Sequence, residues 1–588
     1  MKKLISKQLV KYLEGKGVQH IFGLCGHTNI AFLSQLENST IKFINTRHEQ
    51  IAAHMADGYA RVTKQASVVL SHIGPGLTNT ITAIGTAALD NVPIVIIAGD
   101  APSHYYGRNA FQEVNLYSDA SQYEILRPIV KRAWRVERPD LFPEIIEKAF
   151  QLAENGRPGP VLVSVPMDIF SKEIDVRLFE RLTYHNPKLH KPSIDQETAV
   201  KIIKTLKNAE NPLFLVGGGI MLADASGELR DLVDHMGIPV VNTMMGKGAV
   251  SDDHPLAMGL VGFWGSKFTN EKVRNADYIF ALGTSFGEAD SSSWEEEYTF
   301  NFPPTKLIHI DIDPQEIGRN YPVEIGIVAD LKQSLKVLNK VAKEMVPVPV
   351  QNPTLEKEIA ANKEAFIQSN QEHIKNNCFP MRPERILQET REVLPKDAYI
   401  TTDVGWNKNG VAQRFPIYEA GTVLTPGGFA TMGFGSPAAL GVKVAKPDRV
   451  VVSLVGDGGF GQNPAVLATA AEENIPVIWI IMNNSSYGVI AGLEKAHFDT
   501  TFGTIFYKDG KPYSPDFAAI ARAFGVEGVK IESAEDFKPT LEKAVASKKP
   551  FVIDVSMVNV PTPTGGHWNI MDIYSPNEKK SHAVVSIN

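Results

Sequence analysis

The residues best suited to chemistry lie in two short clusters in the last third of the chain. Gly456-Asp457-Gly458-Gly459 follows the apolar run 450–455, and Asn483-Asn484 follows a second apolar run, 477–482. Glycines let a backbone approach a phosphate and offer it N–H groups. A carboxylate and an amide oxygen are ligands that Mg²⁺ prefers, with phosphate oxygens completing the shell. The clusters favour a metal–phosphate anchor, although a tight strand–helix turn followed by an Asn-rich loop would give the same pattern.

A single carboxylate near the N-terminus is the second candidate. Glu49 stands at the start of a predicted helix, whose apolar residues recur at helical spacing and would bury one face. Those apolar residues are Ile51, Ala52, Met55, Ala56 and Tyr59. A glutamate in a first helical turn also has an ordinary explanation, because its charge opposes the helix dipole. The residue types alone leave both explanations open.

Both candidates resemble the active site of one enzyme family. A Gly-Asp-Gly whose aspartate precedes Asn484 by 27 residues resembles the diphosphate–magnesium signature of thiamine-diphosphate (ThDP) enzymes. The string Arg47-His48-Glu49-Gln50, with Gly58-Tyr59-Ala60-Arg61 after it, resembles a segment of the acetolactate synthase family. The resemblance implies that Mg²⁺ is held by Asp457, Asn484 and the backbone carbonyl of Ser486.

In that family the glutamate activates the cofactor. A carboxyl that hydrogen-bonds N1′ of the aminopyrimidine favours its imino tautomer, whose nitrogen then removes the proton from C2 of the thiazolium ring. The carboxyl must lie in an apolar pocket, where sharing a proton is easier than holding a bare charge. The resemblance therefore makes Glu49 the first catalytic candidate.

Further segments resemble the same family in the same order, so that the resemblance spans nearly the whole chain. Residues 74–79 resemble a glycine loop near the aminopyrimidine, residues 428–439 the segment that bends the cofactor, and residues 564–569 a tail that closes over the site. The cofactor-binding set is then Glu49, Pro75, Asn79, Trp406, Asn407, Ala430, Met432, Gly456, Asp457, Gly458, Gly459, Asn484, Ser486, Tyr487, Gly488 and Val489. The set expected to face the substrate is Gly26, His27, Phe111, Gln112 and Lys131, the last as a basic contact for an acidic substrate or flavin.

Two segments depart from the family pattern. Family members carry Pro-Gly-Gly where this chain has Cys25-Gly26-His27-Thr28. Backbone N–H groups could still act there, and His27 adds a donor or an acid–base group unless it is only a solvated or structural loop residue. Biosynthetic acetolactate synthases carry Met-Val and then a Trp that selects the second ketoacid, whereas this chain has Val489, Ile490 and Leu493. The missing Trp argues against the branched-chain biosynthetic enzyme and leaves the acceptor open.

The elements that must hold these residues form a repeated β–α pattern. Short apolar runs alternate with helical stretches, which is typical of parallel sheets covered on both faces; the runs include residues 68–70, 94–97, 214–216, 307–313, 450–455 and 477–481. Polar, proline-bearing segments divide the chain at 185–192 and 346–353. We therefore predict an α/β protein of three doubly wound parallel-sheet domains. They are a pyrimidine-binding domain (1–180), a central nucleotide-binding-like domain (190–345) and a diphosphate-binding domain (375–556, entered through a charged helical piece, 354–376). A tail (557–588) follows them.

The predicted middle domain has the features of a nucleotide site. Gly217-Gly218-Gly219 follows one apolar run, and the run at 309–314 ends in Asp-Ile-Asp-Pro, a placement that suits an adenine nucleotide. Residues 284–288 lack the Arg that often serves the flavin diphosphate in this family. FAD, ADP and an empty site all stay open.

The composition excludes several other classes of protein. A net charge of −7 and the lack of a Lys/Arg-rich block argue against a nucleic-acid surface. Two cysteines, Cys25 and Cys378, cannot form a disulfide framework or a zinc cluster. No long apolar run predicts a membrane span or a signal segment, so we expect a cytoplasmic protein. No Gly-x-Gly-x-x-Gly opens a helix after the first strand, which argues against a dinucleotide dehydrogenase.

We therefore expect an acetolactate synthase-like enzyme that decarboxylates pyruvate or a related 2-ketoacid and transfers the two-carbon unit to an acceptor. A diketone hydrolase/lyase, an acetyltransferase or a simple decarboxylase would use the same chemistry, and His27 and residues 489–493 favour these rivals. A non-catalytic homologue is hard to reconcile with intact Glu49, Asp457 and Asn484. The two halves of the site lie in different domains and meet across a dimer interface in this family, which implies a homodimer or homotetramer.

Overall fold

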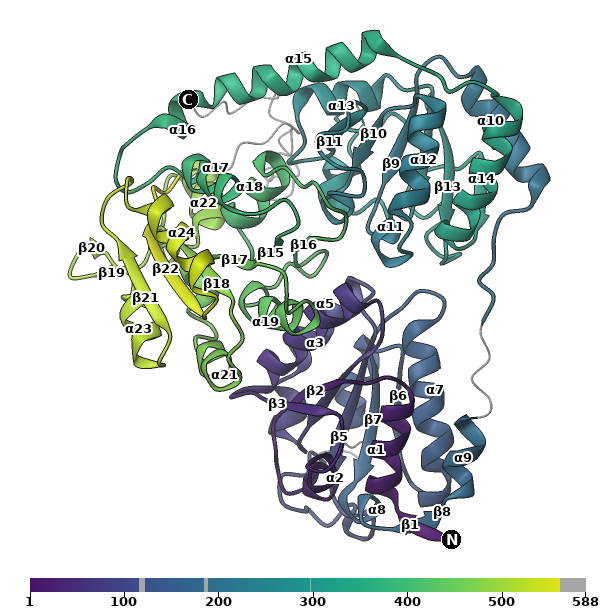
Figure 1. The fold of residues 1–588 in the computed structure, drawn as a ribbon, viewed down its shortest axis with the longest axis vertical. Coiled ribbons are helices and arrows are strands. Elements are labelled where there is room, and N and C mark those ends of the chain that lie inside the picture. Colours follow the sequence, from purple (N-terminus) through teal and green to yellow (C-terminus); the bar gives the residue numbers. More distant parts are fainter. Residues whose placement is uncertain (116–121, 184–188, 297, 561–588) are drawn as a thin grey trace.

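Three α/β domains make up the computed structural model, which describes residues 1–115, 122–183, 189–296 and 298–560 (Figure 1). Each domain is built on a six-stranded sheet whose neighbouring strands are all parallel. The prediction of three parallel-sheet domains is therefore confirmed. The proposed tail beyond residue 560 lies outside the described residues.

The N-terminal sheet reverses its strand order near its middle. Its order is β3 (Lys42–Asn45), β2 (His20–Gly23), β4 (Ser67–Ser71), β5 (Ile94–Asp100), β7 (Val161–Pro166) and β6 (Arg132–Arg135). The direction of winding changes between β2 and β4, and ligands of open α/β sheets collect at the carboxyl edge of such a switch point. Residues 24–29 and 72–74 leave the sheet there.

The C-terminal sheet repeats this topology. Its order is β16 (Val423–Leu424), β15 (Tyr399–Thr402), β17 (Val451–Gly456), β18 (Ile478–Asn483), β22 (Phe551–Ser556) and β21 (Glu527–Ile531). The switch point lies between β15 and β17, so that residues 403–405 and the Gly-Asp-Gly turn share one edge. The sequence clusters thus stand where a ligand is expected.

The central sheet has a different order, that of a dinucleotide-binding fold. Its strands are β11 (Ala257–Leu260), β10 (Val240–Asn242), β9 (Pro212–Val216), β12 (Tyr278–Leu282), β13 (Lys306–Asp311) and β14 (Ile325–Val328). Strand β13 ends at Asp311, two residues before the predicted end, because the Asp311 carboxylate accepts the N–H of Asp313 and turns the chain. The predicted charged helical piece forms α15 (Pro353–Ser369) and α16 (Gln371–Lys375).

The N- and C-terminal domains share one hydrophobic core. Helix α3 (Glu49–Thr63) packs along α19 (Gly435–Ala445), and the two lie together at the domain junction (Figure 1). Gly58 abuts the backbone of Ala438, and Gly441 abuts that of Met55. Residues late in α3 thus meet residues early in α19, so the helices are antiparallel. The sequence predicted one buried face for α3; the helix is buried almost all round because α19 covers its other side.

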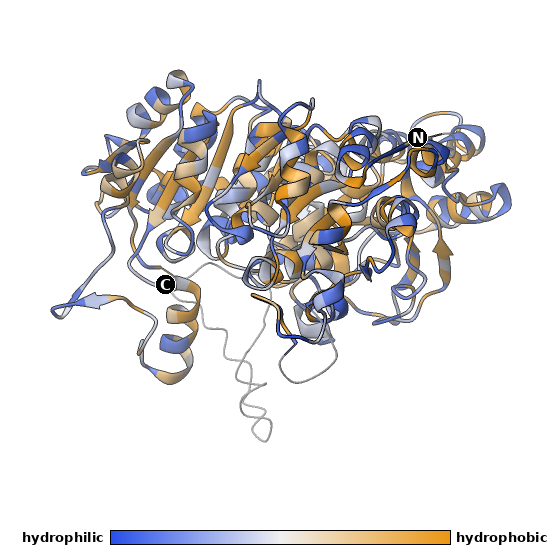
Figure 2. Ribbon diagram, turned by 90° about the horizontal axis from the view of Figure 1, so that it is seen from below, coloured by the Kyte–Doolittle hydropathy of each residue, from blue (hydrophilic) through white to orange (hydrophobic). Residues whose placement is uncertain are grey.

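The apolar residues follow this layered arrangement. The strands are orange in Figure 2, whereas the helices around them carry blue, hydrophilic segments. A separate hydrophobic cluster fills the central domain, from Ile194 to Ile359. None of the described helices combines the length and the apolar composition that crossing a bilayer requires.

Candidate active site

Glu49 is buried at the first turn of α3, with 5% of its surface exposed. The Asn79 amide donates to its Oε2 over 2.9 Å, which joins the two residues that the sequence proposed for the cofactor ring. A Cβ on Gly76 would lie 3.1 Å from Oε1, so this part of the glycine loop passes close to the carboxylate. Oε1 accepts no hydrogen bond from the described residues and is left for a ligand.

The loop after β2 lies against the loop after β4. The rings of His27 and His72 meet edge to face with centroids 4.7 Å apart, and Phe111 lies 5.6 Å from His27. Burial, and then the neighbouring His72, lower the pKa of His27. Sequence reasoning missed His72, although its position directly after a strand at the switch point was a usable signal.

Gln112 reaches this pair of rings, as a pocket residue should. Its Oε1 lies 2.7 Å from Nε2 of His72, whose Nδ1 lies 2.9 Å from the hydroxyl of Thr28. Gly26 has no space for a side chain because the His72 ring fills it. The predicted substrate-facing residues other than Lys131 therefore gather at one place.

Lys131 lies elsewhere. It precedes β6, at the amino edge of the N-terminal sheet and therefore opposite the edge that carries Glu49. Its ammonium donates to the carbonyls of Asn155 (2.9 Å) and Arg157 (2.7 Å) and to that of Leu152, at the end of α7 (Phe142–Glu154). This geometry gives Lys131 a structural task, and its substrate role stays a prediction without support from these contacts.

The metal-binding candidates converge at the C-terminal switch point. Asp457 begins α20 (Asp457–Phe460) and is buried, and burial raises its pKa to about 6. The amide oxygen of Asn484 is placed 3.2 Å from Asp457 Oδ1 and 3.0 Å from the carbonyl oxygen of Ser486. Oxygens placed so close to one another repel. The repulsion is relieved if the Asn484 amide is turned so that its nitrogen donates to Asp457 and Ser486, or if a cation lies between the oxygens.

A magnesium ion fits this arrangement. Octahedral Mg²⁺ holds its ligands at about 2.1 Å, which places neighbouring ligand oxygens about 3.0 Å apart. The amide oxygen of Asn484 lies near that spacing from the oxygens of both Asp457 and Ser486. A cation would also offset the burial that raises the pKa of Asp457.

The polar groups of the proposed diphosphate cradle differ in whether they already have a hydrogen-bond partner. Asn407 is buried, and its Oδ1 is unpartnered within the described part of the chain. The Trp406 indole, in contrast, donates to the carbonyl of Val560, and the Tyr487 N–H donates to Thr504. Asn407 therefore remains a candidate for a ligand, while Trp406 and the Tyr487 backbone are already engaged.

Close packing forms the walls of this cradle. A Cβ on Gly458 would collide with the Tyr487 ring, and one on Gly459 would lie 2.6 Å from Asp403. Gly488 opens α22 (Gly488–Phe498) directly against the Asn484 amide. Val489 Cγ2 would lie 3.9 Å from a Cβ on Gly405, at the edge of the same cradle.

The loop with Met432 is tied to the same switch point. The buried Asp403 carboxylate accepts the N–H groups of Gly433 and Gly435, which fixes the turn that follows Met432. Ala430 has a φ of 46°, a left-handed backbone conformation that is uncommon for a residue with a side chain. The position suits the backbone contacts that the sequence assigned to Ala430 and Met432.

Comparison with known proteins places these features in a family. Residues 4–121 match the thiamine pyrophosphate enzyme N-terminal TPP binding domain, 199–338 its central domain, and 403–555 its C-terminal TPP binding domain. The probable acetolactate synthase large subunit of Methanocaldococcus jannaschii is 35% identical, with 94% of this chain and 91% of the relative aligned. The chain belongs to the ThDP-dependent enzymes of the acetolactate synthase type.

Other relatives agree with this assignment. The probable acetolactate synthase large subunit of Methanococcus aeolicus is 34% identical over 98% of this chain and 96% of its own length. The acetolactate synthase large subunit of Cyanidium caldarium is 32% identical, with coverages of 93% and 92%. All three domains of this ThDP enzyme are thus matched along their length.

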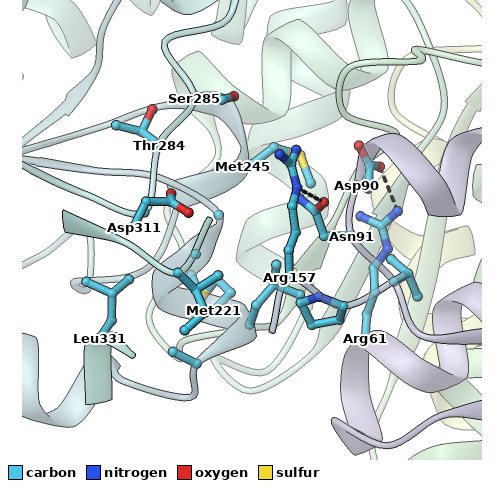
Figure 3. A pocket seen from close by; sticks show the side chains of 18 of the residues that line it. Arg61, Asp90, Asn91, Arg157, Met221, Met245, Thr284, Ser285, Asp311 and Leu331 are labelled. Carbon is cyan, nitrogen blue, oxygen red and sulfur yellow. Dashed lines mark hydrogen bonds and ion pairs between the residues drawn. The ribbon is translucent and has the colours of Figure 1, made fainter. Parts of the chain in front are cut away.

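The ThDP enzyme also has a cavity of about 340 Å³ at the switch point of its central sheet. Figure 3 shows Thr284 and Asp311 on one side of it and two arginines, Arg61 and Arg157, on the other. Arg61 bonds to Asp90 at 2.7 Å, and Arg157 bonds to Asn91 and, at 3.1 Å, to Asp313. Burial raises the pKa of Asp311 to about 6.

Proposed function

We propose that this enzyme uses ThDP and Mg²⁺ to cleave a 2-ketoacid, with pyruvate as the first candidate, and to join the two-carbon unit to a second carbonyl compound. The observation that carries the proposal is Glu49, buried, oriented by Asn79, and with one carboxylate oxygen left for a ligand. The relatives named as acetolactate synthases support pyruvate as donor. When bound, the cofactor supplies a nucleophilic carbon that adds to a ketone carbon.

Separate groups of residues in this chain hold the proton, the metal ion, the diphosphate and the substrate. Glu49 holds a proton at Oε1 against the cofactor's aminopyrimidine, and the apolar side of α3 excludes water from that carboxyl. Asp457, Asn484 and the Ser486 carbonyl hold Mg²⁺, and Asn407 together with glycine N–H groups faces the diphosphate. Gln112 and the histidine pair face the substrate carbonyl.

The test is to incubate the pure protein with ThDP, Mg²⁺ and pyruvate and to identify products by mass spectrometry. We expect acetolactate, and we expect Glu49→Gln to abolish turnover while ThDP still binds, though more weakly. Near-normal activity of Glu49→Gln would contradict the assignment. Wild-type protein that binds ThDP but leaves pyruvate unchanged would overturn pyruvate as the donor.

A diketone lyase is the second candidate, and the His27–His72 pair is the observation that favours it. His27, packed on His72, stands in the loop where the family has Pro-Gly-Gly, and a second carbonyl oxygen could accept a hydrogen bond from its ring. The same assay with a cyclic or linear 1,2-diketone distinguishes the candidates, because cleavage of the diketone without acetolactate formation from pyruvate supports the lyase alone.

We also propose that the enzyme acts as a homodimer or a pair of such dimers. Glu49 begins α3, while Met432 precedes α19; because these helices are antiparallel and the end of α3 meets the start of α19, the two residues are separated by about the length of α3, roughly 20 Å. A single chain therefore does not bring Glu49 to its own diphosphate cradle. Phe111, 77% exposed, and Phe502, 89% exposed, are apolar surface that a partner would cover.

The central cavity is proposed as an adenine-nucleotide site. The buried Asp311 carboxylate ends β13, where an acidic residue can bind ribose hydroxyls. The two arginines at the cavity already pair with acidic side chains, so they offer little net charge to the diphosphate that FAD and ADP share. Both nucleotides therefore stay candidates for this site. Nucleotide released by heat denaturation, together with an absorbance scan, tests this: a flavin spectrum identifies FAD, released ADP without flavin identifies ADP, and no nucleotide would contradict the site.

A further inference from the structure

Two loops from opposite sides of the N-terminal switch point bring two imidazole rings together. His27 follows β2 and His72 directly follows β4, and their rings meet edge to face at 4.7 Å. Neither ring nitrogen of His27 makes a hydrogen bond to the described residues, so both stay available to a ligand. Phe111 lies against another side of the ring, at 5.6 Å, and leaves it only partly exposed.

Hydrogen bonds define the tautomer of His72. Its Nε2 lies 2.7 Å from the Gln112 amide oxygen, which can only accept, so Nε2 carries the proton. Its Nδ1 then accepts from the Thr28 hydroxyl over 2.9 Å. Both nitrogens of His72 are therefore engaged, and this ring has no hydrogen-bonding capacity left for a substrate.

The backbone is shaped around the His72 ring. A side chain on Gly26 would overlap the ring, and a Cβ on Gly76 would lie 2.8 Å from the Cβ of His72 and 3.1 Å from Oε1 of Glu49. His72 and the catalytic carboxylate therefore border the same small space. His27 packs edge to face on the His72 ring, whose two nitrogens are taken by Thr28 and Gln112.

We propose that His27 is the proton-transfer residue for the substrate carbonyl oxygen, and that His72 is a positioning residue that holds the His27 ring in place. The proposal rests on the proposed function, because it requires the cofactor that Glu49 activates to hold the reacting carbonyl beside the loop that carries His27. It assigns different tasks to two histidines of one pair: one has free nitrogens and the other has none.

Product release moves one proton from the product hydroxyl to His27. The hydroxyl that becomes the product carbonyl gives its proton to the lone pair of a His27 ring nitrogen, and the O–H electron pair becomes the second bond of the carbonyl. The bond that held this carbon breaks, and its electron pair leaves with the departing carbon. The next substrate carbonyl takes the proton back from His27 when its π electron pair moves to oxygen.

The surroundings keep His27 in its basic form. Burial and His72 lower its pKa, so the ring is neutral at neutral pH. The other titratable groups near it are Cys25 on its own loop, Glu113, whose carboxylate accepts the N–H of Ala110 on the Phe111 loop, and Glu49 beyond Gly76. A neutral imidazole beside the carbonyl is suited to general base catalysis.

The experiment compares His27→Gln, His72→Gln and the control His104→Gln in full-length protein. His104 is exposed on the turn Ser103–Tyr105. ThDP affinity is measured by titration of protein fluorescence, and kcat and KM with whichever donor, pyruvate or a 1,2-diketone, the wild type turns over. We expect His27→Gln to keep ThDP affinity within about twofold and to lose about 100-fold in kcat.

His72→Gln should behave differently. We expect a smaller loss of kcat, about 10-fold, and a displaced acidic limb of the kcat/KM profile, because the ring that influences the pKa of His27 is gone. Imidazole added to His27→Ala should restore part of the activity, and should do nothing for His72→Ala.

The outcomes distinguish a failure of the histidine roles from a failure of the proposed function. An active wild type with a fully active His27→Gln would overturn the role of His27 alone, and an unchanged profile in His72→Gln would overturn the positioning role. A wild type that turns over neither donor would overturn the proposed function and, with it, this inference. A loss of ThDP binding in His27→Gln would show that the ring serves the cofactor and not the substrate.

Discussion

The proposed function gives the two oxygens of Glu49 separate tasks, and this separation can be tested at Asn79. The Asn79 amide donates to Oε2, and the proposal leaves Oε1 for the cofactor. Asn79→Asp would place a second carboxylate beside Glu49, and two neighbouring carboxylates raise the pKa of one of them. We expect Asn79→Asp to lose at least about 100-fold in kcat and Asn79→Ala about 10-fold, measured by product formation at saturating ThDP. Equal activity of the two variants would contradict an electrostatic role for this contact.

The oxygen cluster around Asp457 leads to a prediction about metal dependence. Asp457→Ala removes the carboxylate that approaches Asn484 and should abolish the increase in ThDP affinity that Mg²⁺ produces. Titrating ThDP with and without Mg²⁺ measures this. Ser514→Ala is the matched control, because Ser514 only donates to the outer oxygen Oδ2 over 3.3 Å and should leave the Mg²⁺ effect largely intact. Unchanged ThDP affinity in Asp457→Ala would show that the metal lies elsewhere.

Among the structural elements, the crossing of α3 and α19 depends on residues without side chains. A Cβ on Gly441 would overlap the carbonyl of Met55 and force the helices apart. We expect Gly441→Ala to lower the melting temperature by more than about 5 °C or to reduce the soluble yield sharply. Gly227→Ala, in α12 (Ser226–Met236), meets nothing within 4 Å and should leave the melting temperature unchanged or slightly raised. Similar melting temperatures for the two variants would contradict the tight crossing.

Helix α3 also buries the ionisable ring of His54, whose contribution to the stability of the fold depends on pH. His54 is fully buried, its ring nitrogens have no partner among the described residues, and burial, aided by Arg61, lowers its pKa to about 3. Between that value and the ordinary pKa near 6.5, the unfolded chain binds a proton that the folded chain excludes. The stability from neutral His54 is therefore complete above about pH 6.5 and is lost as the pH falls toward 3.

His54→Phe should remove this dependence, because phenylalanine keeps a ring against Phe434 and cannot take up a proton. Melting temperatures measured from neutral pH down to about pH 5 should fall less steeply in the variant than in the wild type. The control His104→Phe, at an exposed position, should keep the wild-type slope. Identical slopes for all three proteins would show that His54 does not contribute to acid sensitivity.

The sequence predicts where the strands lie better than it predicts which elements and side chains come into contact. Apolar runs such as 94–97 fall inside β5, because a strand covered on both faces must be apolar throughout. The burial of α3 on both sides was not predictable, since the covering helix lies more than 370 residues away in the chain. For His72, the position directly after a strand was a usable signal, but its contacts with Thr28 and Gln112 are tertiary and sequence spacing does not reveal them. Local patterns thus identify elements, while tertiary contacts decide which side chains act together.

At the scale of the whole molecule, the proposed dimer would complete each active site between two chains. Within one chain, Glu49 lies at the end of α3 that is remote from Met432, and Arg47 pairs with Glu472 at the end of α21 (Val466–Glu473), away from the carboxyl edge that carries Asp457. A symmetric dimer can pair the Glu49 half of one protomer with the Asp457 half of its partner, and symmetry then produces two equal sites.

This arrangement predicts complementation between two inactive variants. Glu49→Gln and Asp457→Ala should each be inactive alone, but a heterodimer of the two contains one site with both residues intact. Random assembly after co-expression gives about half heterodimers, each with one working site of two, so the unfractionated mixture should recover about a quarter of wild-type activity. The two chains carry different affinity tags, and the heterodimer isolated by tandem purification should have about half of wild-type activity. Mixed preparations as inactive as either variant would show that the site forms within one chain, because no pairing could then unite the intact residues.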